Sequence, residues 1–125
     1  MIDFVLVCTG AALGAPARYL VDRAVQARHD TVVPWGTLAV NVAGSLVLGV
    51  LMGLGSGLDV PDGVVLVVGT GFCGALTTYS TFGYETVRLV ETGARFYALA
   101  NVVASLTAGL GAAVVGVALG VAVVP

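Results

Sequence analysis

The sequence contains no lysine, a single histidine and two cysteines, and only 10% of its 125 residues are charged. Its five basic residues, all arginines, form no basic run, so a nucleic-acid-binding face is not expected. Cys8 and Cys73 lie in separate apolar segments, where a lone cysteine behaves as a small hydrophobic residue. These absences argue against nucleic-acid-binding proteins, disulfide scaffolds and cysteine-ligated metal proteins.

Recognisable catalytic motifs are missing as well. No HExxH, GxSxG or phosphate-binding glycine loop occurs, and the only histidine, His29, stands beside Asp30 between two apolar segments. A solvated loop position accounts for that histidine. The sequence therefore does not predict an enzyme.

Apolar residues are abundant instead. They make up 58% of the chain, and the mean hydropathy is +1.06. Since a helix needs about 20 residues to cross the hydrocarbon core, four spans are predicted, at residues 3–25, 35–56, 63–86 and 96–123, the first of them interrupted by Arg18. Short polar connections separate the spans. The sequence predicts an all-α membrane protein with a single four-helix transmembrane domain over residues 1–125.

The arginines fall on one side of this predicted bundle. Arg18 and Arg23 lie in the last part of the first predicted span, Arg28 follows it, and Arg88 and Arg95 follow the third. The opposite loop and the two terminal segments carry only Asp3, Asp59 and Asp62. By the positive-inside rule, both termini are expected to face away from the cytoplasm.

Glycines recur at helix-packing intervals. Pairs with GxxxG spacing are Gly10 and Gly14, Gly49 and Gly53, and Gly116 and Gly120. Such pairs let membrane helices approach closely, within one chain or between two, and do not by themselves indicate a function.

Two pairs of segments are similar at an offset of 60 residues. NVAGSLVLG, residues 41–49, matches NVVASLTAG, residues 101–109, and GAPARY, residues 14–19, matches GALTTY, residues 74–79. Duplication of a two-helix unit and coincidence in a restricted alphabet both account for this pattern. In either case Asn and Ser four residues apart lie on one helix face, so the second and fourth spans each carry a polar stripe.

Hydroxyl side chains and glycines gather in the third span. The hydroxyl residues are Thr70, Thr77, Thr78, Ser80 and Thr81, and the glycines are Gly69, Gly71 and Gly74. Glycine and threonine weaken a helix, and broken backbone at membrane depth is tolerated only where it is buried or lines a cavity. A break near the middle of this span is therefore predicted.

The polar groups predicted at bilayer depth are mostly hydrogen-bond donors. One interpretation is interhelical hydrogen bonding alone, worth about 0.6 kcal/mol on average. The other is a binding site, in which amides, hydroxyls and the ring edges of Tyr79 and Phe82 favour a small anion. Carbonyl groups freed by a helix break are acceptors, and these favour one structural cation.

Three segments resemble a known family. GFCGALTTYSTFGYE, residues 71–85, resembles the signature of the Fluc/CrcB fluoride channels, which reads approximately GxxGGxTTFSTFS. ALGAPARYL, residues 12–20, resembles their first-helix motif, and GTLAVNVAGSLVLGVLMG, residues 36–53, their second-helix motif. The similarity extends over essentially the whole chain.

The resemblance implies an antiparallel dimer with two narrow fluoride pathways at the subunit interface and a central sodium ion. The residues that match the fluoride pathway are Asn41, Tyr79, Ser80, Thr81, Phe82, Asn101 and Ser105. The backbone carbonyls of Gly74 and Thr77 match the sodium ligands, and Arg18 matches a first-helix arginine. The implied function is passive export of cytoplasmic fluoride through the plasma membrane, which protects against fluoride toxicity.

The chain departs from the family pattern in three respects. Tyr79 replaces the usual first phenylalanine of the aromatic pair, and Asn101 replaces a tyrosine common at the head of the fourth-helix track. Homodimeric members insert in both orientations and carry little arginine bias, whereas this chain carries a strong one. Two assemblies stay open: an antiparallel homodimer, and a heterodimer with a homologous subunit of opposite bias.

Two other classes share the size of this chain. A small multidrug-type proton-coupled exporter needs a carboxylate within the membrane, and the acids near a span here, Asp3, Asp22 and Glu85, lie at the edges. A structural membrane subunit without transport accounts for the packing glycines. It does not account for a third span that is rich in donors and free of acids.

Overall fold

The computed structural model describes all 125 residues, and every regular element in it is a helix. The elements are α1 (Ile2–Ala27), α2 (Trp35–Gly55), α3 (Asp62–Val64), the π-helical segment η1 (Val65–Cys73), α4 (Gly74–Leu76), α5 (Ser80–Glu91) and α6 (Arg95–Val123). Segments α3 to α5 form one composite span from Asp62 to Glu91. The prediction of an all-helical chain with four helices able to span a membrane is confirmed.

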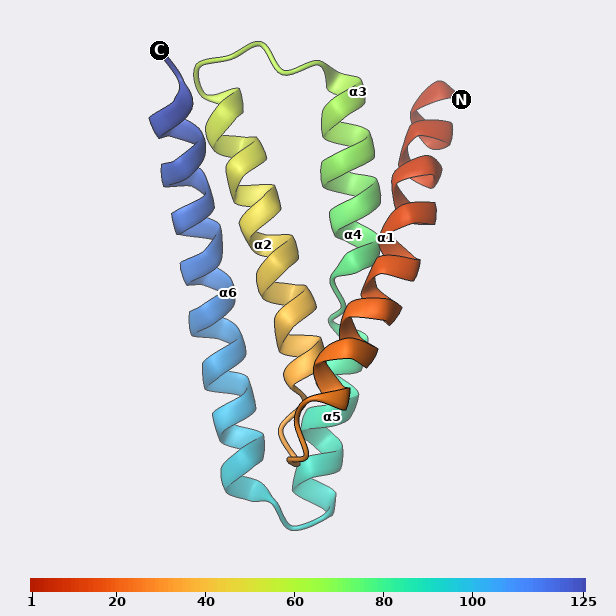
Figure 1. Ribbon diagram of the computed structural model, residues 1–125, viewed down its shortest axis with the longest axis vertical. Helices are drawn as coiled ribbons and strands as arrows, with labels where there is room; N and C mark the ends of the chain where they lie inside the picture. Colours follow the sequence, from red (N-terminus) through yellow and green to blue (C-terminus); the bar gives the residue numbers. More distant parts are fainter.

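The four spans run in alternating directions (Figure 1). Both termini therefore lie at one end of the bundle, and the α1–α2 and α5–α6 connections lie at the other. Helix α2 packs chiefly against α6, and α1 packs chiefly against η1. The third span continues to Glu91, past the end predicted at residue 86. The prediction followed the apolar segment, and the last turns of the helix carry polar residues beyond it, Arg88 among them.

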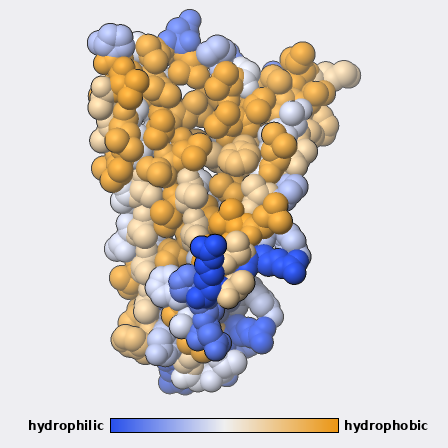
Figure 2. All heavy atoms as spheres, viewed as in Figure 1, coloured by the Kyte–Doolittle hydropathy of each residue, from blue (hydrophilic) through white to orange (hydrophobic).

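Apolar side chains cover the outside of the bundle. Only 19 of the 125 residues are buried, and most of the large apolar side chains are exposed, which suits a chain whose surrounding solvent is lipid. Figure 2 shows hydrophobic atoms over most of one face and hydrophilic atoms gathered toward the lower end, where the α1–α2 and α5–α6 connections lie. The chain is a multi-pass membrane protein.

Glycines form the seam between α2 and α6. A Cβ added at Gly49 would overlap a backbone carbonyl of α6, and one added at Gly116 would overlap a backbone carbonyl of α2. Gly53 and Gly120, one turn further along, are in the same situation. The packing interpretation of these GxxxG pairs is confirmed, and the packing is within one chain.

The first helix is seated on the π-helical segment in the same way. Cβ atoms added at Gly10 and Gly14 would overlap the carbonyl oxygens of Val67 and Phe72 in η1. A π-helix of nine residues is uncommon, since most occur as single wide turns inside α-helices. Backbone contact with α1 supports this stretch along its length.

We expect Gly116→Ala to lower the unfolding temperature of the detergent-solubilised protein. Overpacking costs about 1–3 kcal/mol, which outweighs the gain of up to about 1 kcal/mol that alanine brings to a helix. Gly111→Ala on the same helix is the matched control, because a Cβ there meets no atom within 4 Å. That control should stabilise the protein, and equal unfolding temperatures for the two variants would contradict the seam.

Candidate functional site

The third span is interrupted between α4 and α5. Thr77 has extended backbone angles, φ −79° and ψ 158°, and residues 77–79 belong to no helix. The Thr77 N–H still donates to the Cys73 carbonyl at 3.0 Å, and the Thr77 hydroxyl donates to the same carbonyl at 2.8 Å. The helix thus ends in an orderly way at Thr77, within the cluster of glycine and hydroxyl residues.

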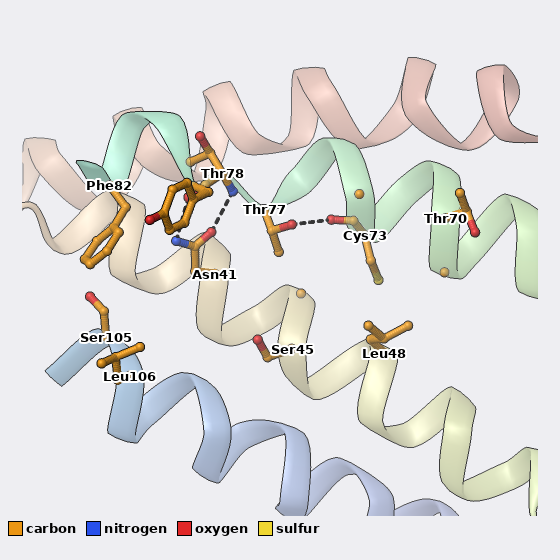
Figure 3. Close-up of a pocket in the computed structure, with 14 residues that line it drawn as sticks. Asn41, Ser45, Leu48, Thr70, Cys73, Thr77, Thr78, Phe82, Ser105 and Leu106 are labelled. Atoms are coloured by element: carbon orange, nitrogen blue, oxygen red, sulfur yellow. Dashed lines mark hydrogen bonds between the residues drawn. The ribbon is translucent and has the colours of Figure 1, made fainter. Parts of the chain in front are cut away.

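Asn41 of α2 binds the peptide groups of Thr78. Its Oδ1 accepts the Thr78 N–H at 2.7 Å, and its Nδ2 donates to the Thr78 carbonyl at 3.0 Å (Figure 3). In an uninterrupted helix, the Thr78 N–H would donate to the carbonyl of Gly74. Because Asn41 takes that donor, the Gly74 carbonyl accepts no hydrogen bond.

The carbonyl of Thr77 is left free for a related reason. Its donor in a regular helix would be the Thr81 N–H, which donates instead to the Thr78 hydroxyl oxygen at 3.2 Å. The same hydroxyl donates to Thr81 Oγ1 at 3.1 Å, so Thr78 caps the first turn of α5. The free carbonyl oxygens of Gly74 and Thr77 are the type of ligand that hard cations bind.

A cavity of about 420 Å³ opens beside this interruption. Asn41 reaches it from α2, Phe82 from α5 and Ser105 from α6, and Figure 3 shows the three gathered toward one end, with Leu48 and Thr70 toward the other. The ring centroids of Tyr79 and Phe82 are 6.1 Å apart, with their planes at 54°. The Asn41 amide, several hydroxyls and two aromatic rings line this cavity together with apolar side chains such as Leu48 and Leu106, and no charged side chain does. The lining provides donors for an anion and no carboxylate for a cation.

The structure brings six of the residues that the family resemblance assigned to the fluoride pathway or the sodium site to this cavity: Asn41, Gly74, Thr77, Tyr79, Phe82 and Ser105. Ser80 and Thr81 lie at the start of α5, where both approach the Thr78 hydroxyl, Ser80 Oγ at 3.5 Å. They contribute to the cap of α5 and do not line this cavity.

Arg18 lies beside a smaller cavity of about 180 Å³. Asp22 and Tyr19 line that cavity from the same helix, α1, Thr78 lines it from the interruption, and Thr81 lines it from the start of α5. Thr78 borders both cavities, whereas Arg18 borders only the smaller one.

Asn101 lies away from the larger cavity. Its side chain is only 3% exposed, and its Nδ2 donates to Thr86 Oγ1 of α5 at 2.9 Å. Ser105, one turn further along α6, does line the cavity. Two residues on the same helix face, expected to act together, therefore contact different groups.

Several residues at the site were not assigned to it from the sequence. Ser45, Thr70 and Thr78, which the sequence placed in polar clusters without assigning them to the pathway, line the larger cavity, and Thr37 of α2, which lies in the second-helix motif without an assigned role, donates a hydrogen bond to Glu85 of α5. The available signal for Thr37 was its position four residues before Asn41, which puts both on one helix face. No signal in a single sequence pairs it with Glu85.

The fold and the cavity define a small four-helix membrane protein with an uncharged cavity, lined by both polar and apolar groups, beside an interrupted span. The chain belongs to the CrcB-like family, described as "CrcB-like protein, Camphor Resistance (CrcB)", whose model matches residues 5–117.

Relatives from distant organisms share most of the chain. A protein of Streptomyces avermitilis named Fluoride-specific ion channel FluC 1 is 60% identical over 116 residues, which cover 93% of this chain and 94% of the relative. The FluC 1 protein of Frankia casuarinae is 57% identical over 98% of both chains. A FluC protein of Methanocaldococcus jannaschii is 45% identical over 80% of this chain and 79% of its own.

Proposed function

We propose that this protein is a fluoride-selective channel of the plasma membrane, through which cytoplasmic fluoride leaves passively, and that it thereby protects the cell against fluoride. The observation that carries the proposal is the cavity at membrane depth, which is lined by donors and aromatic rings and by no charged side chain. The names of the relatives, which are fluoride-specific ion channels, support the same conclusion.

The chemistry of the lining suits a small anion. Fluoride is strongly hydrated, so a pathway has to replace water with donors at close range. The Asn41 amide has a second N–H besides the one that binds Thr78, Ser105 adds a hydroxyl, and Tyr79 and Phe82 add positively polarised ring edges. Three further residues contribute indirectly, through hydrogen bonds or close contacts with Thr78 and Thr86: Ser80, Thr81 and Asn101. A carboxylate-dependent exporter is disfavoured, because no carboxylate lines the cavity.

A second subunit and a sodium ion complete this proposal. The interruption leaves the carbonyls of Gly74 and Thr77 without a donor, and a pair of antiparallel subunits would present both of these carbonyls twice. Sodium accepts oxygen ligands of this kind and would hold the interrupted spans of the two subunits together. The role proposed for sodium is structural, because fluoride passage through the cavity does not itself use the ion.

Fluoride efflux from liposomes containing the purified protein tests the function. A fluoride electrode follows release under a fluoride gradient, and chloride release is measured under an equal chloride gradient. We expect rapid fluoride release and negligible chloride release. Equal rates for the two anions would contradict a selective channel, and silence would be followed by reconstitution with a homologous subunit before the channel is rejected.

The arginine asymmetry leads to a prediction about the partner. If the chain inserts with both termini away from the cytoplasm, an antiparallel partner has to be a homologous subunit of opposite bias. We expect a tag at the C-terminus to be labelled by impermeant reagents mainly from outside intact cells. Equal labelling from both sides would instead identify an antiparallel homodimer with dual topology.

A further inference from the structure

Asn101 connects α6 to the helix that carries Phe82. The Asn101 Nδ2 donates to Thr86 Oγ1 at 2.9 Å, and Thr86 Oγ1 donates to the Phe82 carbonyl at 2.8 Å. The asparagine is 3% exposed, so water does not compete strongly for these groups. Asn101, Thr86 and the Phe82 carbonyl together form what we call the α5–α6 latch.

The direction of the hydrogen bonds in the latch is fixed by its groups. A threonine hydroxyl has one hydrogen, and here it goes to the Phe82 carbonyl, which can only accept. The hydroxyl oxygen is therefore the acceptor for a neighbour, and the Asn101 amide N–H supplies the donor. Neither aspartate nor leucine at position 101 would provide that donor.

Helix α5 is flanked by non-helical residues at both ends, so the neighbouring helices do not fix its position by continuous helical backbone, and a lateral contact contributes to it. It begins at the interruption of residues 77–79 and ends before Gly93, whose positive φ of 86° reverses the chain into α6. The latch joins α5 to α6 between these two points, one turn from Phe82. The Phe82 ring lies in the cavity that Ser105 of α6 also lines.

We propose that Asn101 is a positioning residue for anion passage: through Thr86 it holds α5 against α6, so that the Phe82 ring keeps its place opposite Ser105. The inference rests on the proposed function of the cavity, in which Phe82 lines the fluoride path. In this arrangement Asn101 acts on the path without touching the anion, and Ser105, one turn further along α6, lines the path directly.

A double-mutant cycle on fluoride efflux tests the latch. Asn101→Leu and Thr86→Val, which is close to isosteric, should each slow efflux by roughly threefold to fifteenfold, the range corresponding to interhelical hydrogen bonds measured in membranes. The double variant should be no slower than the slower single variant. Thr86→Ser retains the hydroxyl and should restore the wild-type rate, and Thr107→Val, whose hydroxyl donates only within α6, should not change it.

Two results would overturn the latch. The first is a double variant whose loss of efflux equals the product of the two single losses, which would indicate that Asn101 contacts the anion itself. The second is wild-type efflux for Thr86→Val. Absence of efflux from the wild type, with or without a homologous subunit, would refute the proposed function, and the positioning role with it. The same cycle measured on the unfolding temperature separates these cases, because coupling there reports the hydrogen bonds irrespective of transport.

Discussion

Replacing Phe82 with isoleucine should abolish fluoride efflux and leave the folded assembly intact. Isoleucine fills a similar apolar volume but has no ring edge to face an anion. A barrier raised by about 3 kcal/mol slows passage roughly a hundredfold, which brings efflux close to the leak of protein-free liposomes. Efflux and the elution volume of the purified variant are the two measurements.

A phenylalanine outside the site provides the matched control. Phe96, near the start of α6, is 75% exposed and does not line the cavity, so Phe96→Ile should conduct like the wild type. Unchanged efflux in Phe82→Ile would remove this ring from the pathway, whereas equal losses in both variants would point to a general effect of losing an aromatic residue.

Asn41→Asp should stop fluoride efflux for two separate reasons. The carboxylate still accepts the Thr78 N–H but has no N–H for the Thr78 carbonyl, so one of the two bonds is lost. It also places a negative charge on the cavity, where repulsion of an anion about 4 Å away amounts to about 4 kcal/mol at an effective dielectric constant near 20. Together these effects should lower efflux roughly a thousandfold.

Asn41→Leu separates the two effects, because it removes both hydrogen bonds without adding a charge. A buried N–H left without a partner costs about 1–3 kcal/mol, or else it returns to the Gly74 carbonyl. An unpaired N–H should lower the unfolding temperature. An N–H that returns to the Gly74 carbonyl should instead lower the dependence of that temperature on sodium. Asn41→Asp, by contrast, should act mainly on efflux. If Asn41→Leu and the wild type share both the unfolding temperature and its dependence on sodium, the interruption does not depend on this amide.

The spans were predictable from the sequence because their signal is local. Runs of apolar residues locate the helices, and the cluster of glycine and threonine residues locates the interruption near Thr77. The π-helical winding of Val65–Cys73 had no comparable signal, since it depends on backbone contact with Gly10 and Gly14 of another helix.

The roles of the two asparagines illustrate what pattern alone leaves out. Asn41 and Asn101 occupy matching places in similar segments, and the sequence treats them alike. In the structure Asn41 meets the peptide groups of Thr78, which have no helical partner, whereas Asn101 meets a threonine on an intact helix. The difference lies in the neighbouring element, which a periodicity within one helix does not describe.

The π-helical segment makes the third span sensitive to its own length. Each residue of an α-helix turns the chain by about 100°. The wider π-helical winding of Val65–Cys73 fits more residues into the same axial length than an α-helix does. Gly71 of this segment lies against Gly10 and Ala11 of α1, and deleting one residue and rewinding the segment as an α-helix would rotate the part of the segment on one side of the deletion, so that Gly71 and α1 no longer face each other. Insertions and deletions, more than substitutions, are therefore the sequence changes that natural variation in this segment should avoid.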